Sequence, residues 1–196
     1  MVAKLTTVFS EYEIKNSAIK INDESSSTFN KVGCVGSIEE ALDCITVTKK
    51  CEGVVKKTVT RGAGTGETKI TLHMNYNLYV SLFGMDQKGL KEGVYAYGTG
   101  SRHKEFCYVG EVMDEDGNIK YKAYPRCSVK TGPANKIENG GEEVQEIEMT
   151  FSLYPDKYGN CEYESPAIEL DEETKIKWMT EFTPELTQTS EVQVSE

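Results

Sequence analysis

The feature that most constrains the fold of this 196-residue chain is the alternation of apolar and polar side chains over residues 147–153. Ile147, Met149, Phe151 and Leu153 fall on one face of an extended segment, because successive side chains of a strand point to opposite sides. A period of two predicts a β-strand with one buried face and one solvated face. The chain must therefore form a sheet with a core on at least one side.

The opposite face of this predicted strand is polar. It carries Glu146, Glu148, Thr150 and Ser152. Because it alternates with a buried face, it must meet water or another subunit. The preceding strand-like run, residues 121–130, offers three cations: Lys122, Arg126 and Lys130. Two interpretations stay open. Either the glutamates remain free on an exposed surface, or they pair with these cations, which would contribute only about 0–1 kcal/mol per pair.

A long loop is predicted between the two strands. Gly132 and Pro133 end the first strand, and the Asn-Gly-Gly sequence at 139–141 supplies residues that tolerate positive φ. The connection is too long for a tight hairpin, and long ordered loops on a rigid sheet are common sites of partner contact. The alternative is an ordinary β-meander with a floppy connection.

Further strands are predicted at residues 44–50, 53–61 and 67–74, which are rich in Val, Ile and Thr. A glycine-rich loop, residues 62–66, is expected to join the last two. It lacks the Gly-Lys-Ser/Thr sequence and the following helix of a phosphate-binding loop. Residues 36–42 fit either a short helical turn with a capping box or a turn leading into a strand.

One helix is expected over residues 75–85. Leu78 and Leu82 lie on one side at four-residue spacing, Asn75 or Asn77 can cap its start, and Gly84 can end it. A single short helix among strands must pack on a sheet, because alone it would be unstable. The sequence patterns therefore predict a β-rich domain with one helix and long loops.

The net charge of −10 is concentrated at one end of the sequence. From residue 162 to the end, ten acids face only Lys175 and Lys177, so this segment contributes −8. The pattern is typical of a solvated acidic tail and argues against a protein that grips nucleic acid through its phosphates. No apolar run is long enough to cross a membrane, and the first residues do not resemble a signal peptide, which predicts a cytoplasmic protein.

No constellation for catalysis, metal or cofactor is found, so the chain is not expected to be an enzyme and no cofactor is expected. The six cysteines include no C-x-x-C pair, and in a cytoplasmic protein they are expected to be reduced and mostly buried thiols. The acids at 114–116 resemble part of a calcium loop, but the later ligands are missing. Asp116-Gly117 instead predicts a hairpin turn.

Stretches spread over residues 35–165 resemble the major tail protein, or tail tube protein, of long-tailed bacteriophages that infect Gram-positive bacteria. They are residues 41–48, the helix sequence NYNLYVSLFGM with the following GLKEGVY, the hairpin around Asp116-Gly117, and SVKTGPANKIENGGEEVQEIEMTFSLYPD. The resemblance divides the chain into an N-terminal arm and loop (1–34), a tail-tube β domain (35–165) and an acidic C-terminal extension (166–196). The extension is less typical of the family.

The resemblance implies a mainly β fold of two packed antiparallel sheets, a sandwich or small barrel, flanked by one α-helix. It implies self-assembly into stacked rings, commonly hexameric, that form a hollow tube in the virion tail, built in the cytoplasm of the host bacterium. Expected partners are further copies of the chain, the tape measure protein, and the tail terminator and tail-tip proteins. DNA would pass through the channel without specific binding, and no membrane is involved.

Two sets of residues receive roles from this interpretation. The residues expected to line the channel are Glu146, Glu148, Thr150 and Ser152, whose carboxylates would repel phosphate. The residues expected to contact neighbouring subunits are Thr131, Gly132, Pro133, Asn135, Lys136, Glu138 and Asn139. One departure is a concentration of positive charge on the strand-rich part. If these cations faced the channel, the argument for a repulsive lining would weaken; the alternative is that they face acids of a neighbouring ring. The residues are Lys49, Lys50, Lys56, Lys57, Arg61 and Lys69.

Two alternatives share the predicted fold class. One is the tube protein of a phage-derived contractile particle, a bacteriocin or a secretion-like device. The other is a β-sandwich module that binds carbohydrate or a receptor. Modules of the second kind usually expose clustered aromatic residues on loops, and the residues that could serve here are Tyr95, Tyr97 and Tyr158.

Overall fold

The structure is a computed structural model, and it describes residues 4–23, 28–140 and 144–189. The strands are β1 (Glu13–Ile21), β2 (Asn30–Lys31), β3 (Val35–Cys51), β4 (Val54–Leu72), β5 (Glu105–Met113), β6 (Ile119–Val129), β7 (Ile147–Leu153) and β8 (Tyr163–Pro166). The helices are α1 (Tyr76–Leu82) and α2 (Glu172–Thr180), with short 3-10 turns at Ala167–Glu169 and Pro184–Thr187. The predicted mainly β fold with a flanking helix is confirmed.

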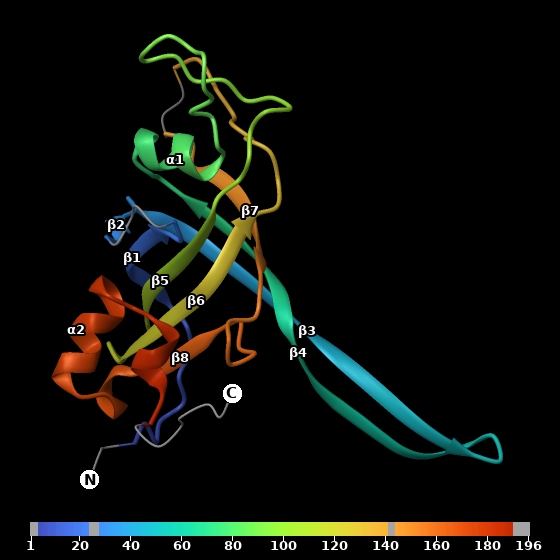
Figure 1. The fold of residues 1–196 in the computed structure, drawn as a ribbon. Helices are drawn as coiled ribbons and strands as arrows, with labels where there is room; N and C mark the ends of the chain where they lie inside the picture. Colours follow the sequence, from blue (N-terminus) through green and yellow to red (C-terminus); the bar gives the residue numbers. More distant parts are fainter. Residues whose placement is uncertain (1–3, 24–27, 141–143, 190–196) are drawn as a thin grey trace.

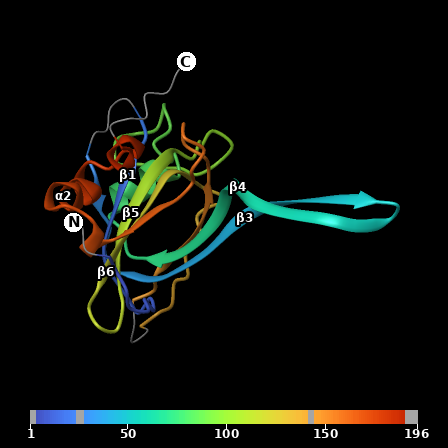
Figure 2. The ribbon, with the colours of Figure 1, turned by 90° about the horizontal axis from the view of Figure 1, so that it is seen from below.

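The strands form one antiparallel sheet that curls around its core (Figures 1 and 2). Its order is β2-β1-β5-β6-β7-β4-β3, with β8 paired to β6. β1 and β3 lie near opposite ends of this order, yet they come into contact. The two halves of the curled sheet therefore face each other across the core, as the two layers of a sandwich do.

The main core lies inside this curl and confirms the alternation in β7. Met149, Phe151 and Leu153 are buried there with Ile19 of β1 and Ile70 of β4. The two arms predicted from the sequence do pair, with Cys127 opposite Leu153 and Val129 opposite Phe151.

The predicted helix is also confirmed. The Asn75 side chain accepts a hydrogen bond from the Asn77 amide at 2.8 Å, which caps α1 at its start. Leu78 and Leu82 are buried against the sheet, as their spacing predicts. Gly84 follows the helix with φ of +58°, and a Cβ there would collide with the Arg102 backbone.

A second core lies on the outer face of β1, β5 and β6, where α2 covers it (Figure 1). Trp178 and Phe182 are buried there against Val109 and Ala123. The solvated tail predicted for the C-terminal segment is therefore wrong for residues 167–189, because apolar residues spaced among the acids dock on the sheet. Residues 190–196 lie outside the described part of the chain.

Two local predictions need correction around β3 and β4. Residues 36–42 are strand rather than a helical turn, and the Ser37 hydroxyl contacts the Thr71 hydroxyl across the pair at 3.0 Å. Residues 62–66 are not a loop between strands, because β4 runs through them. The register shifts there, with Leu42 opposite Gly66 but Cys44 opposite Gly62, which marks a bulge in β4.

The hairpin turn predicted between β5 and β6 is confirmed. Gly117 adopts φ of +85°, and the Asp114 carboxylate accepts hydrogen bonds from the amides of Asp116 and Asn118 at 3.0 and 2.7 Å. These bonds close an Asx-type turn, so the Asp114 carboxylate serves the backbone.

Candidate functional site

The most distinctive feature of the molecule is a β-hairpin that projects from the body (Figures 1 and 2). We call residues 44–62, the distal parts of β3 and β4 with their turn, the projecting hairpin. Every residue from 39 to 62 is exposed. The strand from Cys44 to Cys51 alone spans roughly 25 Å at about 3.3 Å per residue. A two-stranded ribbon of this length has no core of its own and is marginal in water.

The turn of the projecting hairpin explains how two strands continue so far from the body. Glu52 and Gly53 connect them, with φ values of +52° and +79°. Positive φ at both central residues is the signature of a type I′ turn, whose twist matches that of the flanking strands. Gly53 adopts this conformation at no steric cost.

One face of the projecting hairpin is apolar and basic. Ile45 lies opposite Arg61, Val47 opposite Val59, and Lys49 opposite Lys57. Ile45, Val47 and Val59 are 42, 59 and 47% exposed, although β-branched side chains on one strand face normally pack on a core. An exposed row of this kind is a surface for pairing with another molecule.

The other face of the projecting hairpin is a ladder of threonines. The hydroxyls of Thr46 and Thr60 lie 3.0 Å apart, and those of Thr48 and Thr58 lie 3.4 Å apart. Cross-strand pairs of this kind stabilise the ribbon by a few tenths of a kcal/mol, up to about 1 kcal/mol each. The two faces therefore differ. On the threonine face the hydroxyls contact each other across the two strands, whereas the side chains of the apolar face are exposed to solvent.

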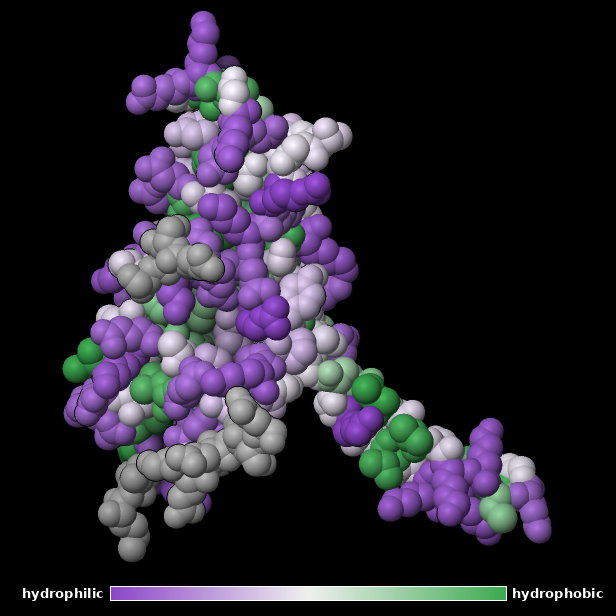
Figure 3. Space-filling model, in the orientation of Figure 1, coloured by the Kyte–Doolittle hydropathy of each residue, from purple (hydrophilic) through white to green (hydrophobic). Residues whose placement is uncertain are grey.

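The charge of the projecting hairpin is opposite to that of the rest of the chain. It carries five bases and one acid, a formal charge of +4 against −10 for the whole chain, which leaves −14 elsewhere. Figure 3 shows hydrophobic surface along the stem and hydrophilic surface toward the tip. An extended basic arm on an acidic body favours an acidic partner.

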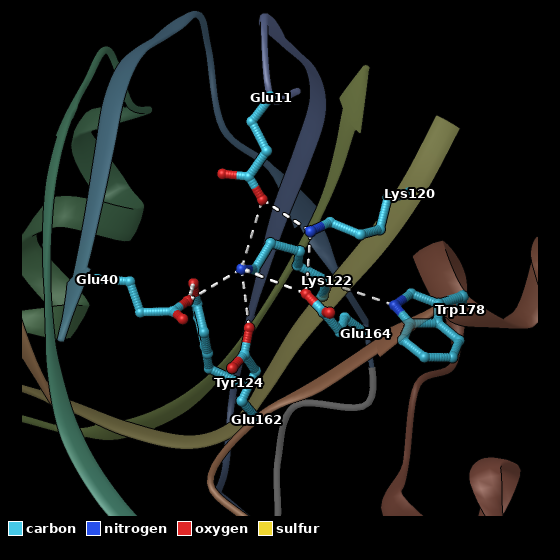
Figure 4. Close-up of polar contacts among 8 residues, drawn as sticks. All are labelled: Glu11, Glu40, Lys120, Lys122, Tyr124, Glu162, Glu164 and Trp178. Atoms are coloured by element: carbon cyan, nitrogen blue, oxygen red, sulfur yellow. Dashed lines mark hydrogen bonds and ion pairs between the residues drawn. The ribbon is translucent and has the colours of Figure 1, made fainter. Parts of the chain in front are cut away.

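An ion-pair cluster around the buried Lys122 anchors the root of β3 to the body (Figure 4). Lys122 of β6 lies at its centre, and its Nζ is 2.8 Å from a Glu162 oxygen and 3.1 Å from a Glu40 oxygen. Tyr124 of β6 donates a hydrogen bond to Glu40, which belongs to β3. These contacts tie the strand that leads into the projecting hairpin to the centre of the sheet.

The cluster extends to both ends of the described chain. Glu11, just before β1, lies 2.8 Å from Lys120 and 3.9 Å from Lys122. Glu164 of β8 contacts both lysines, at 3.0 and 3.7 Å. The Trp178 indole donates a hydrogen bond to the Lys122 carbonyl at 3.3 Å, so α2 is fixed to the same strand.

The protonation states follow from burial and charge. Burial acts to lower the pKa of Lys122, but the carboxylates of Glu162 and Glu40 outweigh it and hold that pKa above its ordinary value. Burial, to which the neighbouring Glu40 carboxylate adds, raises the pKa of Glu162 despite the nearby Lys122 ammonium. Burial, and then the Glu40 carboxylate, raise the pKa of Tyr124. A lysine held charged in this way is a structural cation rather than a base for proton transfer.

The residues predicted to line a channel share one surface. Glu148, Thr150 and Ser152 lie on the outer face of β7, and Glu146 directly precedes the strand. The cations proposed as their partners are engaged elsewhere, since Lys122 binds Glu40 and Glu162, Arg126 binds Glu105 at 2.8 Å, and Lys130 binds Glu67. Glu148 instead pairs with Lys69 of β4 at 3.2 Å. Of the two interpretations left open by the sequence, the one in which these glutamates pair with Lys122, Arg126 or Lys130 is therefore wrong.

The residues predicted to contact neighbouring subunits form a loop beside α1. Pro133 is half-buried, whereas Thr131, Gly132, Asn135, Lys136, Glu138 and Asn139 are exposed. The Asn135 amide donates to the Tyr79 hydroxyl of α1 at 2.9 Å, and Lys136 pairs with Glu138 at 2.5 Å. This loop and the start of β7 border a groove of about 780 Å³ that includes Glu146 and Glu148. Residues 141–143 of the loop lie outside the described residues.

The cysteines divide into two groups. All six are free thiols; Cys107, Cys127 and Cys161 are buried, but Cys34, Cys44 and Cys51 are exposed. The expectation of mostly buried thiols is therefore wrong for half of them, because β3 carries two of these and Cys34 directly precedes it. Burial raises the pKa of Cys107 to about 12, which keeps it protonated and unreactive.

Among residues 4–23, 28–140 and 144–189, no group of three or more His, Cys, Asp or Glu side chains is arranged to hold a metal ion. No helix within the same ranges is long and apolar enough to cross a membrane.

Comparison with known proteins adds no family assignment. No protein-family profile matches the chain, and no curated protein sequence matches it. The functional interpretation therefore depends on the residues and the geometry of the site.

The projecting hairpin has a local signal in the sequence. The runs at 44–51 and 54–61 are separated by two residues, Glu52 and Gly53, which is the spacing of a tight hairpin. The expected loop at 62–66 concealed the continuity of β4. No local pattern in the sequence could indicate that the hairpin stays uncovered by the rest of the described chain.

Proposed function

We propose that the chain is a structural subunit that assembles with copies of itself, as the tail tube subunit of a long-tailed bacteriophage. One observation carries the proposal: the projecting hairpin exposes an apolar and basic face over the whole of its length. A monomer gains nothing from such an arm, since exposed two-stranded ribbons are marginal and prone to pairing. An assembly covers the arm and closes its edges.

The position of the anchor supports an assembly role. The Lys122 cluster holds the root of β3 against the centre of the sheet and against α2. A rigid root gives the projecting hairpin a defined direction, and a defined direction is needed for identical subunits to repeat one contact. An arm that served only as a flexible linker would need no such anchor.

The polar face of β7 supports a channel in such an assembly. Glu146, Glu148, Thr150 and Ser152 lie on the outside of the curled sheet, opposite the core. In a ring this face lies either on the bore or on the outer wall. We propose the bore, because carboxylates repeated around a ring repel the phosphates of DNA in transit.

Electron microscopy of the purified chain tests the proposal. We expect rings or stacked tubes whose amount increases with protein concentration. A dispersed monomer at all concentrations would contradict the proposal. A reconstruction of the assembly that placed Glu146 and Glu148 on the outer wall would overturn the channel assignment alone. Both a phage tail and a contractile particle contain such tubes. A tube whose outer surface binds a sheath would favour the contractile particle.

A second candidate function has a specific observation in its favour. Tyr76, Tyr95 and Tyr97 are 59, 38 and 48% exposed beside α1, and the rings of Tyr76 and Tyr95 meet edge to face with centroids 5.7 Å apart. Exposed clustered aromatics suit a carbohydrate- or receptor-binding module. A glycan-array experiment on the purified chain tests this candidate. Binding by a chain that never assembles would favour it over the tube subunit.

A further inference from the structure

We infer that the projecting hairpin of one copy docks on the exposed face of α2 in a second copy. This inference rests on the proposed self-assembly and identifies the two surfaces that meet. It assigns a role to the acidic C-terminal segment, which the resemblance to tail tube proteins does not cover.

Charge excludes the simplest alternative, in which two projecting hairpins pair with each other. Each carries a formal charge of +4, and Lys49 and Lys57 lie directly opposite each other on the apolar face. Like charges brought together in an interface cost several kcal/mol. The partner surface must therefore be acidic, and in a self-assembling protein it must come from the part of the chain that carries −14.

The outer face of α2 combines acidic and apolar side chains in the way that the hairpin requires. The side chains of Glu172 and Glu173 are 84 and 76% exposed. Ile176, one turn further on, is 66% exposed, and Ile168 before the helix is 52% exposed. Isoleucines exposed among glutamates match valines and an isoleucine exposed among lysines and an arginine.

The acids of α2 remain available to a partner. Glu172 pairs with Lys175 at 2.6 Å and Glu173 with Lys177 at 2.5 Å, both within the helix. Exposed pairs at this spacing contribute only about 0.3–0.5 kcal/mol. They can therefore exchange for lysines of another copy. The inner face of α2 holds Trp178 in the second core, so the helix presents its outer face on a fixed support.

The two surfaces lie on opposite sides of the body. In Figure 1 the projecting hairpin extends to one side while α2 covers the other, and Figure 2 shows the same separation from below. A contact between different surfaces of identical subunits is heterologous, and it continues from one copy to the next until a ring closes or a filament grows. This is the geometry that a ring of tail tube subunits needs.

Two charge-reversal variants test the inference. The arm variant combines Lys49→Glu with Lys57→Glu, and the helix variant combines Glu172→Lys with Glu173→Lys. Matched controls make the same changes of charge elsewhere, with Lys88→Glu plus Lys91→Glu in an exposed loop and Glu115→Lys plus Asp116→Lys in the β5–β6 turn. Assembly is measured by sedimentation over a concentration series, and folding by circular dichroism.

We expect each variant alone to assemble at least about tenfold more weakly than the natural chain, and the controls to assemble normally. An equimolar mixture of the two variants should regain assembly. In the mixture, the arm of one variant, whose formal charge is zero and whose apolar face carries carboxylates at positions 49 and 57, meets the basic helix of the other. The remaining arms and helices keep their natural charges. If mixing restores assembly, both variants must be folded, so the loss seen with each variant alone comes from the changed charges.

The other outcomes separate this inference from the proposed function. If the arm variant loses assembly while the helix variant keeps it, the arm has another partner and the inference is overturned, although self-assembly stands. If the natural chain never assembles but binds a short DNA duplex that the arm variant does not bind, the function of the basic arm is to bind nucleic acid. That result would overturn both proposals.

Discussion

β7 and the projecting hairpin follow one sequence rule but reach different outcomes. In β7 the alternating apolar residues Met149 and Phe151 are buried inside the curled sheet. In the hairpin the alternating residues Val47 and Val59 face solvent. The difference shows that alternation predicts a face that needs covering, while the rest of the chain decides whether the cover is internal. An uncovered face on a well-anchored strand indicates a partner.

The first prediction compares the loss of one apolar side chain from the core with the loss of one from the projecting hairpin. Phe151→Ala should lower the free energy of unfolding by about 4 kcal/mol, since it leaves a cavity among fully buried side chains. Urea denaturation at a dilution that keeps the chain monomeric measures this change. Val59→Ala is the matched variant on the projecting hairpin and should change the same quantity by no more than about 0.5 kcal/mol. A large loss for Val59→Ala would mean that its face is covered within one chain.

The second prediction concerns the anchor between the two regions. Lys122→Met should cost about 3 kcal/mol of unfolding free energy, because it leaves the carboxylates of Glu40 and Glu162 without their shared cation. Lys69→Met removes an exposed partner of Glu148 and should cost at most about 1 kcal/mol. Equal costs for the two variants in urea denaturation would show that the cluster is no stronger than a surface pair.

The anchor also gives a pH dependence with a defined sign. The folded-state pKa of Lys122 lies above its ordinary value of 10.5, so the folded chain holds this proton more tightly than the unfolded chain. Its contribution is complete below about pH 10.5 and is lost as the pH rises through the folded-state pKa. The stability gap between the natural chain and Lys122→Met should therefore shrink as the pH rises through that folded-state pKa. A gap that stayed constant on the alkaline side would contradict the assignment.

A smaller effect tests whether the C-terminal segment belongs to the fold. Asp171 caps α2 by accepting a hydrogen bond from the Thr174 amide at 2.9 Å. Asp171→Ala should cost about 1 kcal/mol in the main unfolding transition. Glu172→Ala, next to it and exposed, is the control and should leave that transition almost unchanged. If Asp171→Ala had no effect either, α2 would melt separately from the sheet.

The smallest effect concerns the cysteines. Since all six are free, a reductant should barely change the melting temperature. A fall of ten degrees or more, about what the loss of a disulfide would cause, would contradict this. A thiol reagent should label Cys34, Cys44 and Cys51 in the folded monomer and all six cysteines after denaturation. Protection of Cys44 and Cys51 on assembly would place the projecting hairpin inside an interface.

The sequence could predict the elements whose signals are local. The alternation in β7, the cap at Asn75 and the turn at Gly117 each depend on residues within a few positions, and all three are confirmed. The role of the C-terminal segment could not be predicted in this way. Its acids dominate the composition, while Trp178 and Phe182 pack on strands that lie more than fifty residues earlier in the sequence.

The candidate site was predictable only in part, for the same reason. The basic residues near Lys49 and Lys57 were evident in the sequence, and acids of a neighbouring ring were one of the two surroundings considered for them. Their common exposed face depends on the register that pairs Lys49 with Lys57. A register shift at Lys56, between the Lys50–Val55 and Lys49–Lys57 pairs, displaces it from the alignment that the two-residue turn alone would give. The Lys122 cluster joins residues 11, 40, 122 and 162, and only the curl of the sheet brings them together.

The most direct test of the assembly role is to remove the projecting hairpin together with the bulge at its base. Leu42 and Gly66 are opposite each other, so replacing residues 43–65 with Asn-Gly leaves a tight hairpin in the same register, with Glu40 still bound to Lys122. Sedimentation velocity over a concentration series then compares the shortened chain with the natural one. We expect a folded monomer from the shortened chain and rings or tubes from the natural chain. Assemblies of equal size from both would contradict the central claim.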